Sequence, residues 1–286
     1  MDQETRQAAI DLYDRFTHDG IERRTFMGRM IALAGSVAAA EALIASIAAS
    51  PAAAAIVPAN DARLTTRTQK LGNGYTAYIA EPRTRSLKAS VLVIHENRGL
   101  NDHIRDVTRR VALAGYRAVA PDLLSAAGGT PANEDAARDA IGKLDLGATV
   151  SAGVAMLQEI GGSSRGGKVG AVGFCWGGGF VDRLAVAAGD KLAAGVSYYG
   201  PAPDPSEAAK VLAPMLLHLA GTDTRVAATA WPFASALGQA GKAVEVFVYP
   251  GAYHAFNNDT SAERYNKAAA ALAWGRSMDF FGRYLG

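Results

Sequence analysis

The sequence has few cysteines, a small net charge and no metal-binding motif. Its 286 residues include one cysteine, which excludes an intrachain disulfide and any metal site built from several thiolates. The formal net charge is +2 and no block of lysine and arginine occurs, so we expect no nucleic-acid partner. The five histidines show neither HExxH nor a comparable spacing, so we expect no metal. Apolar residues make up 49%, as is ordinary for a globular protein held together by its core.

The first 59 residues form a compositionally separate extension. Its Arg23–Arg24 pair precedes an alanine-rich apolar stretch that runs from Met30 to Val57. Alanines 53–55 within this stretch suit a small-residue cleavage site. The pattern resembles a bacterial twin-arginine signal and predicts a periplasmic protein, exported after folding.

Two features disagree with a signal and leave an alternative open. Glu41 interrupts the apolar stretch, and residues 1–22 carry six acids against two arginines where a signal needs positive charge. Glu41 also argues against a permanent membrane span, because a carboxylate is costly inside a bilayer. In the alternative, a cytoplasmic protein keeps the extension uncleaved. In either case we expect a monomer or a homodimer, and we expect His18 at the surface of the extension. The first helix would then present an apolar stripe formed by Ile10, Leu12, Tyr13 and Phe16.

Residues 60–286 show strands that alternate with helices. The segment 72–74 (GNG) joins two strands, 64–70 and 75–80, in a β-hairpin. Further strands are expected at 89–95, 116–120, 168–172, 193–199, 214–219 and 243–249. Helices are expected at 101–114, 133–160 with a break near Gly142 or Gly147, 177–187, 227–239 and 261–283. This order predicts an α/β domain whose mostly parallel sheet is covered by helices on both faces.

The single cysteine, Cys175, lies in the segment 173–177 (GFCWG), directly after an apolar strand. Glycines on both sides let strand and helix approach closely, which is typical of a nucleophile elbow with sulfur in place of a serine hydroxyl. The N-terminus of the following helix favours a thiolate, and the Trp176 backbone N–H is the expected first oxyanion donor. A glycine-rich turn can also hold an inert cysteine, so this interpretation depends on partners.

Two candidate partners follow later strands. Asp223 comes just after the strand at 214–219, and His254 comes just after the strand at 243–249. Both therefore reach the sheet edge that carries Cys175, in the order nucleophile, acid, histidine. Taken alone, Asp223 could be a helix cap and His254 could line a loop. Together, order, residue type and position predict a Cys-His-Asp triad.

A third segment, 95–100 (HENRGL), ends an earlier strand at the same edge. Its loop is expected to supply the second oxyanion amide, from Asn97, and to bring Glu96 close to Cys175. The alternative for Glu96 and Arg98 is a solvated ion pair. At another strand end, Tyr198 and Tyr199 could line the pocket or could serve only in packing.

Five ordered segments resemble the dienelactone hydrolase (carboxymethylenebutenolidase) family over roughly residues 65–285: 96–100 (ENRGL), 120–123 (APDL), 173–178 (GFCWGG), 221–223 (GTD) and 253–256 (YHAF). The resemblance implies an α/β-hydrolase that opens ester or lactone bonds without a cofactor. It implies Cys175 as nucleophile, His254 as base and Asp223 as the residue that orients the base. It also implies that Glu96 pairs with the neutral thiol at rest. Phe256, in the last of the five segments, is a candidate substrate-binding residue, as are Arg98, Tyr198 and Tyr199.

One departure from the family pattern concerns the substrate. Dienelactone hydrolases place an arginine a few residues after the histidine, whereas here the segment 254–259 reads HAFNND. A second substrate-binding arginine is expected upstream in the helical region, where Arg138 is one candidate, and Arg98 could compensate by reaching an anionic group. We therefore expect a small ester or lactone, without fixing dienelactone itself. A thioesterase or amidase on the same triad, or a redox-sensing or binding protein that uses Cys175, are the alternatives.

Overall fold

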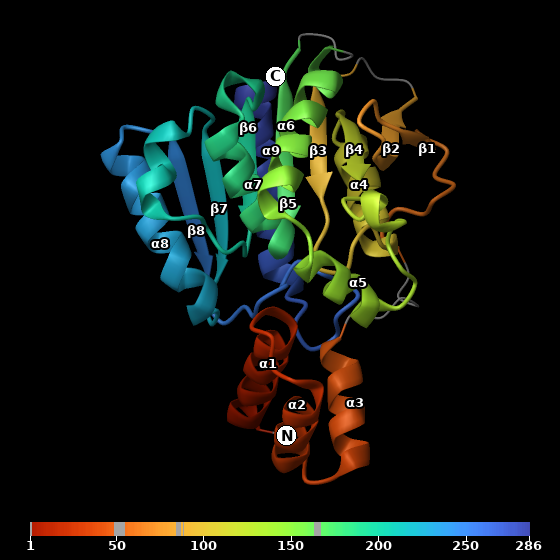
Figure 1. Cartoon of the computed structure of the whole chain (residues 1–286), viewed down its shortest axis with the longest axis vertical. Coiled ribbons are helices and arrows are strands. Elements are labelled where there is room, and N and C mark those ends of the chain that lie inside the picture. The colour runs from red at the N-terminus through yellow and green to blue at the C-terminus, as the bar shows by residue number, and fades with distance from the viewer. Residues whose placement is uncertain (1, 49–54, 84–86, 88, 163–166) are drawn as a thin grey trace.

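An eight-stranded sheet runs through the computed structural model, which describes residues 2–48, 55–83, 87, 89–162 and 167–286 (Figure 1). The strands are β1 Leu64–Lys70, β2 Thr76–Pro82, β3 Ser90–Ile94, β4 Arg117–Pro121, β5 Val169–Phe174, β6 Ala194–Tyr198, β7 Met215–Ala220 and β8 Val244–Tyr249. Their spatial order is β1-β2-β4-β3-β5-β6-β7-β8. The hairpin β1–β2 and the pair β2–β4 are antiparallel, and every other pair is parallel. The mostly parallel α/β sheet predicted from the sequence is confirmed.

Helices cover both faces of this sheet. They are α4 Asp102–Leu113, α5 Glu134–Gly142, α6 Leu146–Gly162, α7 Trp176–Ala187, α8 Thr224–Gln239 and α9 Lys267–Leu285. Side chains of α4 and α9 build one apolar core, and side chains of α6, α7 and α8 build the other. Strand β3 shows the division, because Val91 and Val93 enter the first core while Leu92 and Ile94 enter the second. A strand buried on both faces reads as a continuous apolar run, as β3 does.

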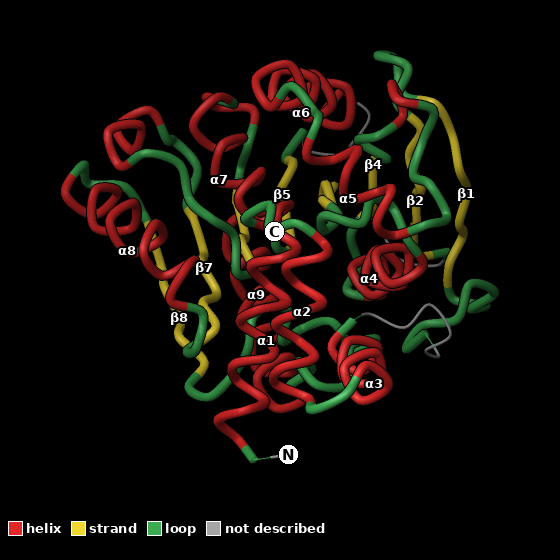
Figure 2. Tube along the Cα trace, turned by 60° about the horizontal axis from the view of Figure 1, so that its bottom comes forward, coloured by secondary structure: helices red, strands yellow, loops and turns green. Residues whose placement is uncertain are grey.

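Three N-terminal helices form a separate bundle at the edge where the parallel strands end (Figure 1). They are α1 Gln3–His18, α2 Arg23–Ala34 and α3 Val37–Ile47, and we refer to residues 3–47 as the cap. The predicted apolar stripe of α1 faces the interior of this bundle: Ile10, Leu12 and Tyr13 are buried and Phe16 is partly buried. In Figure 2, where this end comes forward, the cap lies between α8 on one side and α4 on the other.

Most element boundaries lie within three residues of those expected from the sequence. The expected helix at 133–160 breaks between α5 and α6, and the last helix begins six residues later than expected, because Asn266 caps it. Among the described residues, no single helix has the length and apolar character needed to cross a membrane, and two bent pairs, α2 with α3 and α5 with α6, pass only by length and composition. Residues 53 and 54 of the expected cleavage site lie outside the described residues.

Candidate active site

A sharp turn between β5 and α7 presents Cys175. The residue has φ 56° and ψ −120°, a strained backbone conformation for a residue that is not glycine. A Cβ atom on Gly173 would lie 2.0 Å from the carbonyl oxygen of Gly177, and one on Gly177 would lie 2.3 Å from that of His95. Only glycine therefore lets strand and helix approach so closely. The turn has the geometry of a nucleophile elbow.

Asp223 and His254 are joined at the same edge. His254 donates from Nδ1 to the Asp223 Oδ2 atom over 2.5 Å, while the Asp223 Oδ1 atom accepts from the Val226 backbone N–H and caps α8. The cap role and the orienting contact thus coexist. Burial favours the neutral carboxyl, but the contact with His254 outweighs it and lowers the pKa of Asp223 to about 2. Burial likewise opposes the charged imidazole, yet Cys175 and Asp223 together raise the pKa of His254 to about 10.

The Cys175 sulfur has an imidazole partner that the sequence did not suggest. His18, the last residue of α1, places Nε2 2.9 Å from the sulfur, and its ring meets the His254 ring edge-on at 4.9 Å. The expectation of a surface His18 is wrong, because docking of the cap directs the end of α1 into the site. Burial favours the neutral thiol, but His18 and then His254 outweigh it and hold the pKa of Cys175 well below its ordinary value.

The imidazole of His254 also lies close to the Cys175 sulfur. Ring nitrogens of His18 and His254 and the Cys175 sulfur all lie within 4.8 Å of one another. The Nε2 atom of His254 is buried and has no hydrogen-bond partner among the described residues. With a pKa of about 10, the His254 imidazole is protonated at neutral pH, and this nitrogen is placed to donate its proton. Two imidazoles and one thiolate in this arrangement could also hold a soft divalent metal ion such as Zn²⁺.

The loop after β3 lies beneath the cap. One carboxylate oxygen of Glu96 accepts from the Asn258 side-chain amide at 2.8 Å, and the other is buried with no partner among the described residues. At rest, therefore, the Cys175 sulfur contacts His18, where the resemblance implied Glu96. The Asn97 side chain donates to the Thr17 carbonyl of the cap at 3.2 Å.

Arg98 and Trp176 also keep defined surroundings. Arg98 pairs with Glu134 at 2.5 Å and donates to the Tyr13 hydroxyl at 2.7 Å, so the cap partly shields this ion pair, and the two side chains are 10% and 25% exposed. The Trp176 ring stacks on the ring of His95 at 5.8 Å. Its backbone N–H opens α7, where the first amides have no carbonyl within the helix to bond. The oxyanion roles of the Trp176 and Asn97 amides stay predictions.

The two strand-end tyrosines differ. The Tyr198 hydroxyl bonds Ser277 of α9 inside the core at 2.7 Å, so the packing alternative describes it and the pocket-lining one does not. A positive φ of 40° turns Tyr199 toward the site, where its ring lies 5.0 Å from that of His254. Its buried hydroxyl has no partner among the described residues. Phe256 is fully buried and packs against Tyr199 at 5.3 Å, behind the catalytic edge.

The cavity at Cys175 is almost closed. Its volume is about 20 Å³, enough for roughly one water molecule. Cap and sheet domain share its lining, which includes Tyr13, His18, Glu96, Cys175, His254 and Arg264. Two larger grooves flank it: one of about 290 Å³ between α1 and α8 reaches His254, and one of about 360 Å³ between the cap and α5 reaches Arg98.

Arg264, which sequence reasoning missed, pairs with Asp14 of the cap at 3.3 Å. Arg138, the upstream candidate, pairs with Asp135 and Asp139.

Comparison with known proteins identifies the family and the fold. Residues 75–285 match the model of the dienelactone hydrolase family. Proteins provisionally named carboxymethylenebutenolidase are 32% identical, over 250 residues in Saccharolobus solfataricus (72% of this chain, 93% of that protein) and over 259 residues in Escherichia coli K12 (84% and 94%). The crystal structure of a provisionally named dienelactone hydrolase from Klebsiella pneumoniae superposes with a TM-score of 0.70 at 26% identity, covering 77% of this chain and 99% of that one. The chain therefore belongs to the dienelactone hydrolase family of the α/β-hydrolase superfamily, and it is an ester or lactone hydrolase.

Proposed function

We propose that the protein hydrolyses small esters or lactones through a Cys175-His254-Asp223 triad and a thioester intermediate. The observation that carries this proposal is the 2.5 Å contact between His254 and Asp223, beside a cysteine on a strained elbow at the same sheet edge. An inert cysteine would need neither the oriented imidazole nor the strained backbone.

The proposed cycle moves one proton through His254. The Cys175 thiolate attacks the substrate carbonyl carbon, and the Trp176 and Asn97 amides stabilise the resulting oxyanion. The carbon–oxygen bond to the leaving group then breaks, the alkoxide takes a proton from His254, and a thioester remains on sulfur. His254 next accepts a proton from water as the water attacks the thioester. Release of the acid restores the thiolate and the imidazolium.

The substrate is expected to be small and to carry an anionic group that can pair with an arginine. Arg98 and Arg264 are the two arginines that line the cavity, and each already has a partner, Glu134 and Asp14 respectively. A carboxylate on the substrate could replace one of those partners. Comparing the kcat/KM of a neutral ester with that of its carboxylate-bearing analogue tests this expectation.

Turnover of a p-nitrophenyl ester and of an enol-lactone tests the proposal as a whole. We expect the wild-type protein to cleave at least one of them and Cys175→Ala to abolish cleavage, with circular dichroism confirming that the variant is folded. Equal rates in the two proteins would reject Cys175 as nucleophile. Faster turnover on thioesters or amides would assign the same triad to the alternative substrates. Oxidation of Cys175 with no turnover on any of these would favour the redox-sensing alternative.

A further inference from the structure

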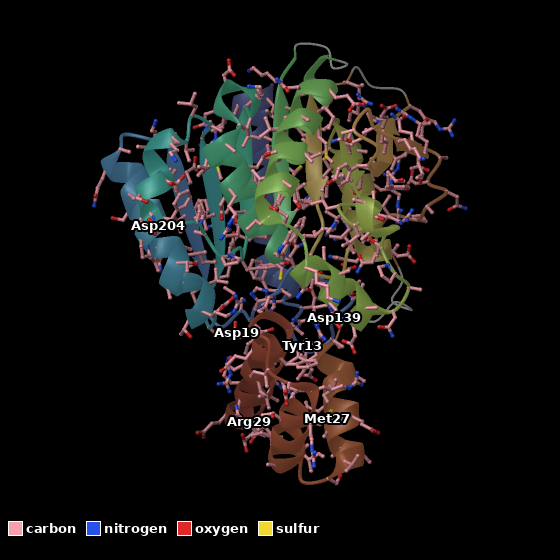
Figure 3. All side chains as sticks on the ribbon, in the orientation of Figure 1. Tyr13, Asp19, Met27, Arg29, Asp139 and Asp204 are labelled. Carbon is pink, nitrogen blue, oxygen red and sulfur yellow. The ribbon has the colours of Figure 1, made fainter. Side chains whose placement is uncertain are left out.

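The cap is bound to the sheet domain mainly by polar contacts. Its own apolar core is separate and is built by α1, α2 and α3, with Tyr253 packed against it. Besides the contact between His18 and Cys175, the polar contacts across the boundary include, among the described residues, Arg6–Glu263 at 3.1 Å, Tyr13–Arg98 at 2.7 Å, Asp14–Arg264 at 3.3 Å, Thr17–Asn97 at 3.2 Å, Arg23–Asp135 at 3.1 Å, Ser46–Glu263 at 3.1 Å and Ile47–Ser261 at 2.6 Å. Figure 3 shows Tyr13 and Asp19 near this boundary, and Met27 and Arg29 farther from it. Interfaces of this polar kind are typical of parts that move relative to each other.

The hydrogen bonds of His18 fix which ring nitrogen carries the exchangeable proton. Its Nδ1 atom lies 2.8 Å from the Asp14 carbonyl oxygen, which can only accept, and 2.9 Å from the Thr17 hydroxyl. Because that hydroxyl donates to the backbone carbonyls of α1, it is left to accept from Nδ1, so Nδ1 carries a hydrogen. The remaining nitrogen, Nε2, faces the Cys175 sulfur at 2.9 Å. One proton is therefore shared between this nitrogen and the sulfur, either as a thiol with a neutral imidazole or as a thiolate with an imidazolium.

The same contact closes the site. A cavity of about 20 Å³ beside Cys175 has no room for an acyl group. His18, Thr17 and Tyr13 form its cap side, and all three belong to the last turns of α1. An ester can reach the sulfur only if this end of α1 moves away from it.

We propose that the cap is a working part of the active site and that His18 is a further catalytic residue. In the resting enzyme His18 bonds the sulfur and holds it as a thiolate, in the position that the family resemblance gave to Glu96. When substrate enters, the cap withdraws and His18 leaves the sulfur, while His254 remains to transfer protons. This inference rests on the proposed function only in that Cys175 is the nucleophile.

Alkylation of Cys175 by iodoacetamide tests the resting contact without requiring turnover. Because the chain has one cysteine, the rate reports on this sulfur alone. We expect His18→Ala and His18→Gln to raise the midpoint of the pH dependence of alkylation by at least about one unit, whatever change in absolute rate the smaller side chain causes. Arg29→Ala is the matched control, because it removes a positive charge from an exposed position of the same cap. Its midpoint should equal that of the wild type.

A different result is expected if His18 only blocks access to the sulfur. If His18 only plugs the site, His18→Ala will speed alkylation at every pH and leave the midpoint where it is, and the assignment is then wrong. The result also separates this inference from the proposed function. A shifted midpoint in a protein that turns over no ester would support the resting contact between His18 and Cys175 and reject the proposed hydrolysis through Cys175. Turnover through Cys175 with an unchanged midpoint of the pH dependence would support the hydrolase and reject the role of His18.

A cross-link tests the withdrawal of the cap. The Ser46 carbonyl accepts from the Glu263 backbone N–H, so the two backbones adjoin at the boundary. A Ser46→Cys/Glu263→Cys protein, shown by mass spectrometry to be cross-linked, should lose at least about tenfold in Cys175 alkylation at pH 7 relative to Ser46→Ala/Glu263→Ala. An unchanged rate in the cross-linked protein would show that small molecules reach the sulfur with the cap in place, and withdrawal would be rejected.

Discussion

Replacing Asp223 by asparagine should separate its two roles. Asparagine is as good a helix N-cap as aspartate, so the bond from the Val226 backbone N–H to the side chain at position 223 should survive. The charge opposite His254 is lost, however, and an amide does not hold the imidazole in the required tautomer. By analogy with other hydrolases that carry such a triad, we expect kcat to fall by about 10⁴-fold.

The stability cost of Asp223→Asn follows from the pKa of that carboxyl. A fall from the ordinary 3.8 to about 2 corresponds to about 2 kcal/mol at neutral pH. The larger rise in the pKa of His254 also contains the effect of Cys175, so the Asp223 value is the better measure of this contact. Because the folded carboxyl has the lower pKa, its stabilisation is present above about pH 4 and is lost as the pH falls toward 2.

Two assays check these expectations for Asp223→Asn. Urea denaturation at pH 7 should give a free energy of unfolding lower than that of the wild type by up to about 2 kcal/mol, and the difference should vanish near pH 2. Turnover of a p-nitrophenyl ester should give the loss in kcat. If the variant keeps kcat within about tenfold of the wild type while Cys175→Ala is inactive, Asp223 does not orient the base and the reasoning fails.

Two further predictions follow from the crowding at the elbow and from the histidine pair. Gly177→Ala places a Cβ 2.3 Å from the His95 carbonyl oxygen and should lower the free energy of unfolding by at least about 2 kcal/mol, whereas Gly238→Ala, with nothing within 4 Å, should raise it slightly; equal melting temperatures would contradict the first. Zn²⁺ should inhibit turnover by binding His18, Cys175 and His254, and His18→Ala should weaken that inhibition at least about tenfold; undiminished inhibition in the variant would place the ion elsewhere.

The sheet domain could be predicted from the sequence because apolar periodicity and turn residues indicate the same boundaries for most strands and helices. Apolar runs such as β3 are flanked by turn residues, and the positions of Cys175, Asp223 and His254 follow once each is placed after a parallel strand. Side chains alternate between the two faces of β6, so Tyr198 lies on the same face as Val196, which packs in the core. That parity favours the packing role that the structure shows.

The contact between His18 and Cys175 could not be predicted in the same way. The two residues are 157 positions apart, and the contacts that dock α1 are individual polar bonds with no period in the sequence. The irregular loop after His254 is a second case. It carries Asn258 to Glu96 and Arg264 to Asp14, and an expected helix start at 261 overlapped it because its composition is also compatible with a helix.

The predicted export signal and the proposed role of His18 require different N-termini in the mature protein. Cleavage near residues 53–55, as an export signal predicts, would remove α1 and with it His18 from the mature protein. A His18 that holds the nucleophile requires that the cap remain. Mass spectrometry of the protein purified from its native host decides between them: an N-terminus at residue 1 or 2 would support a retained cap, and one beyond residue 50 would support the export signal. Loss of residues 1–50 from an active enzyme would also reject His18 as a catalytic residue, since catalysis would then proceed with Cys175, His254 and Asp223 alone.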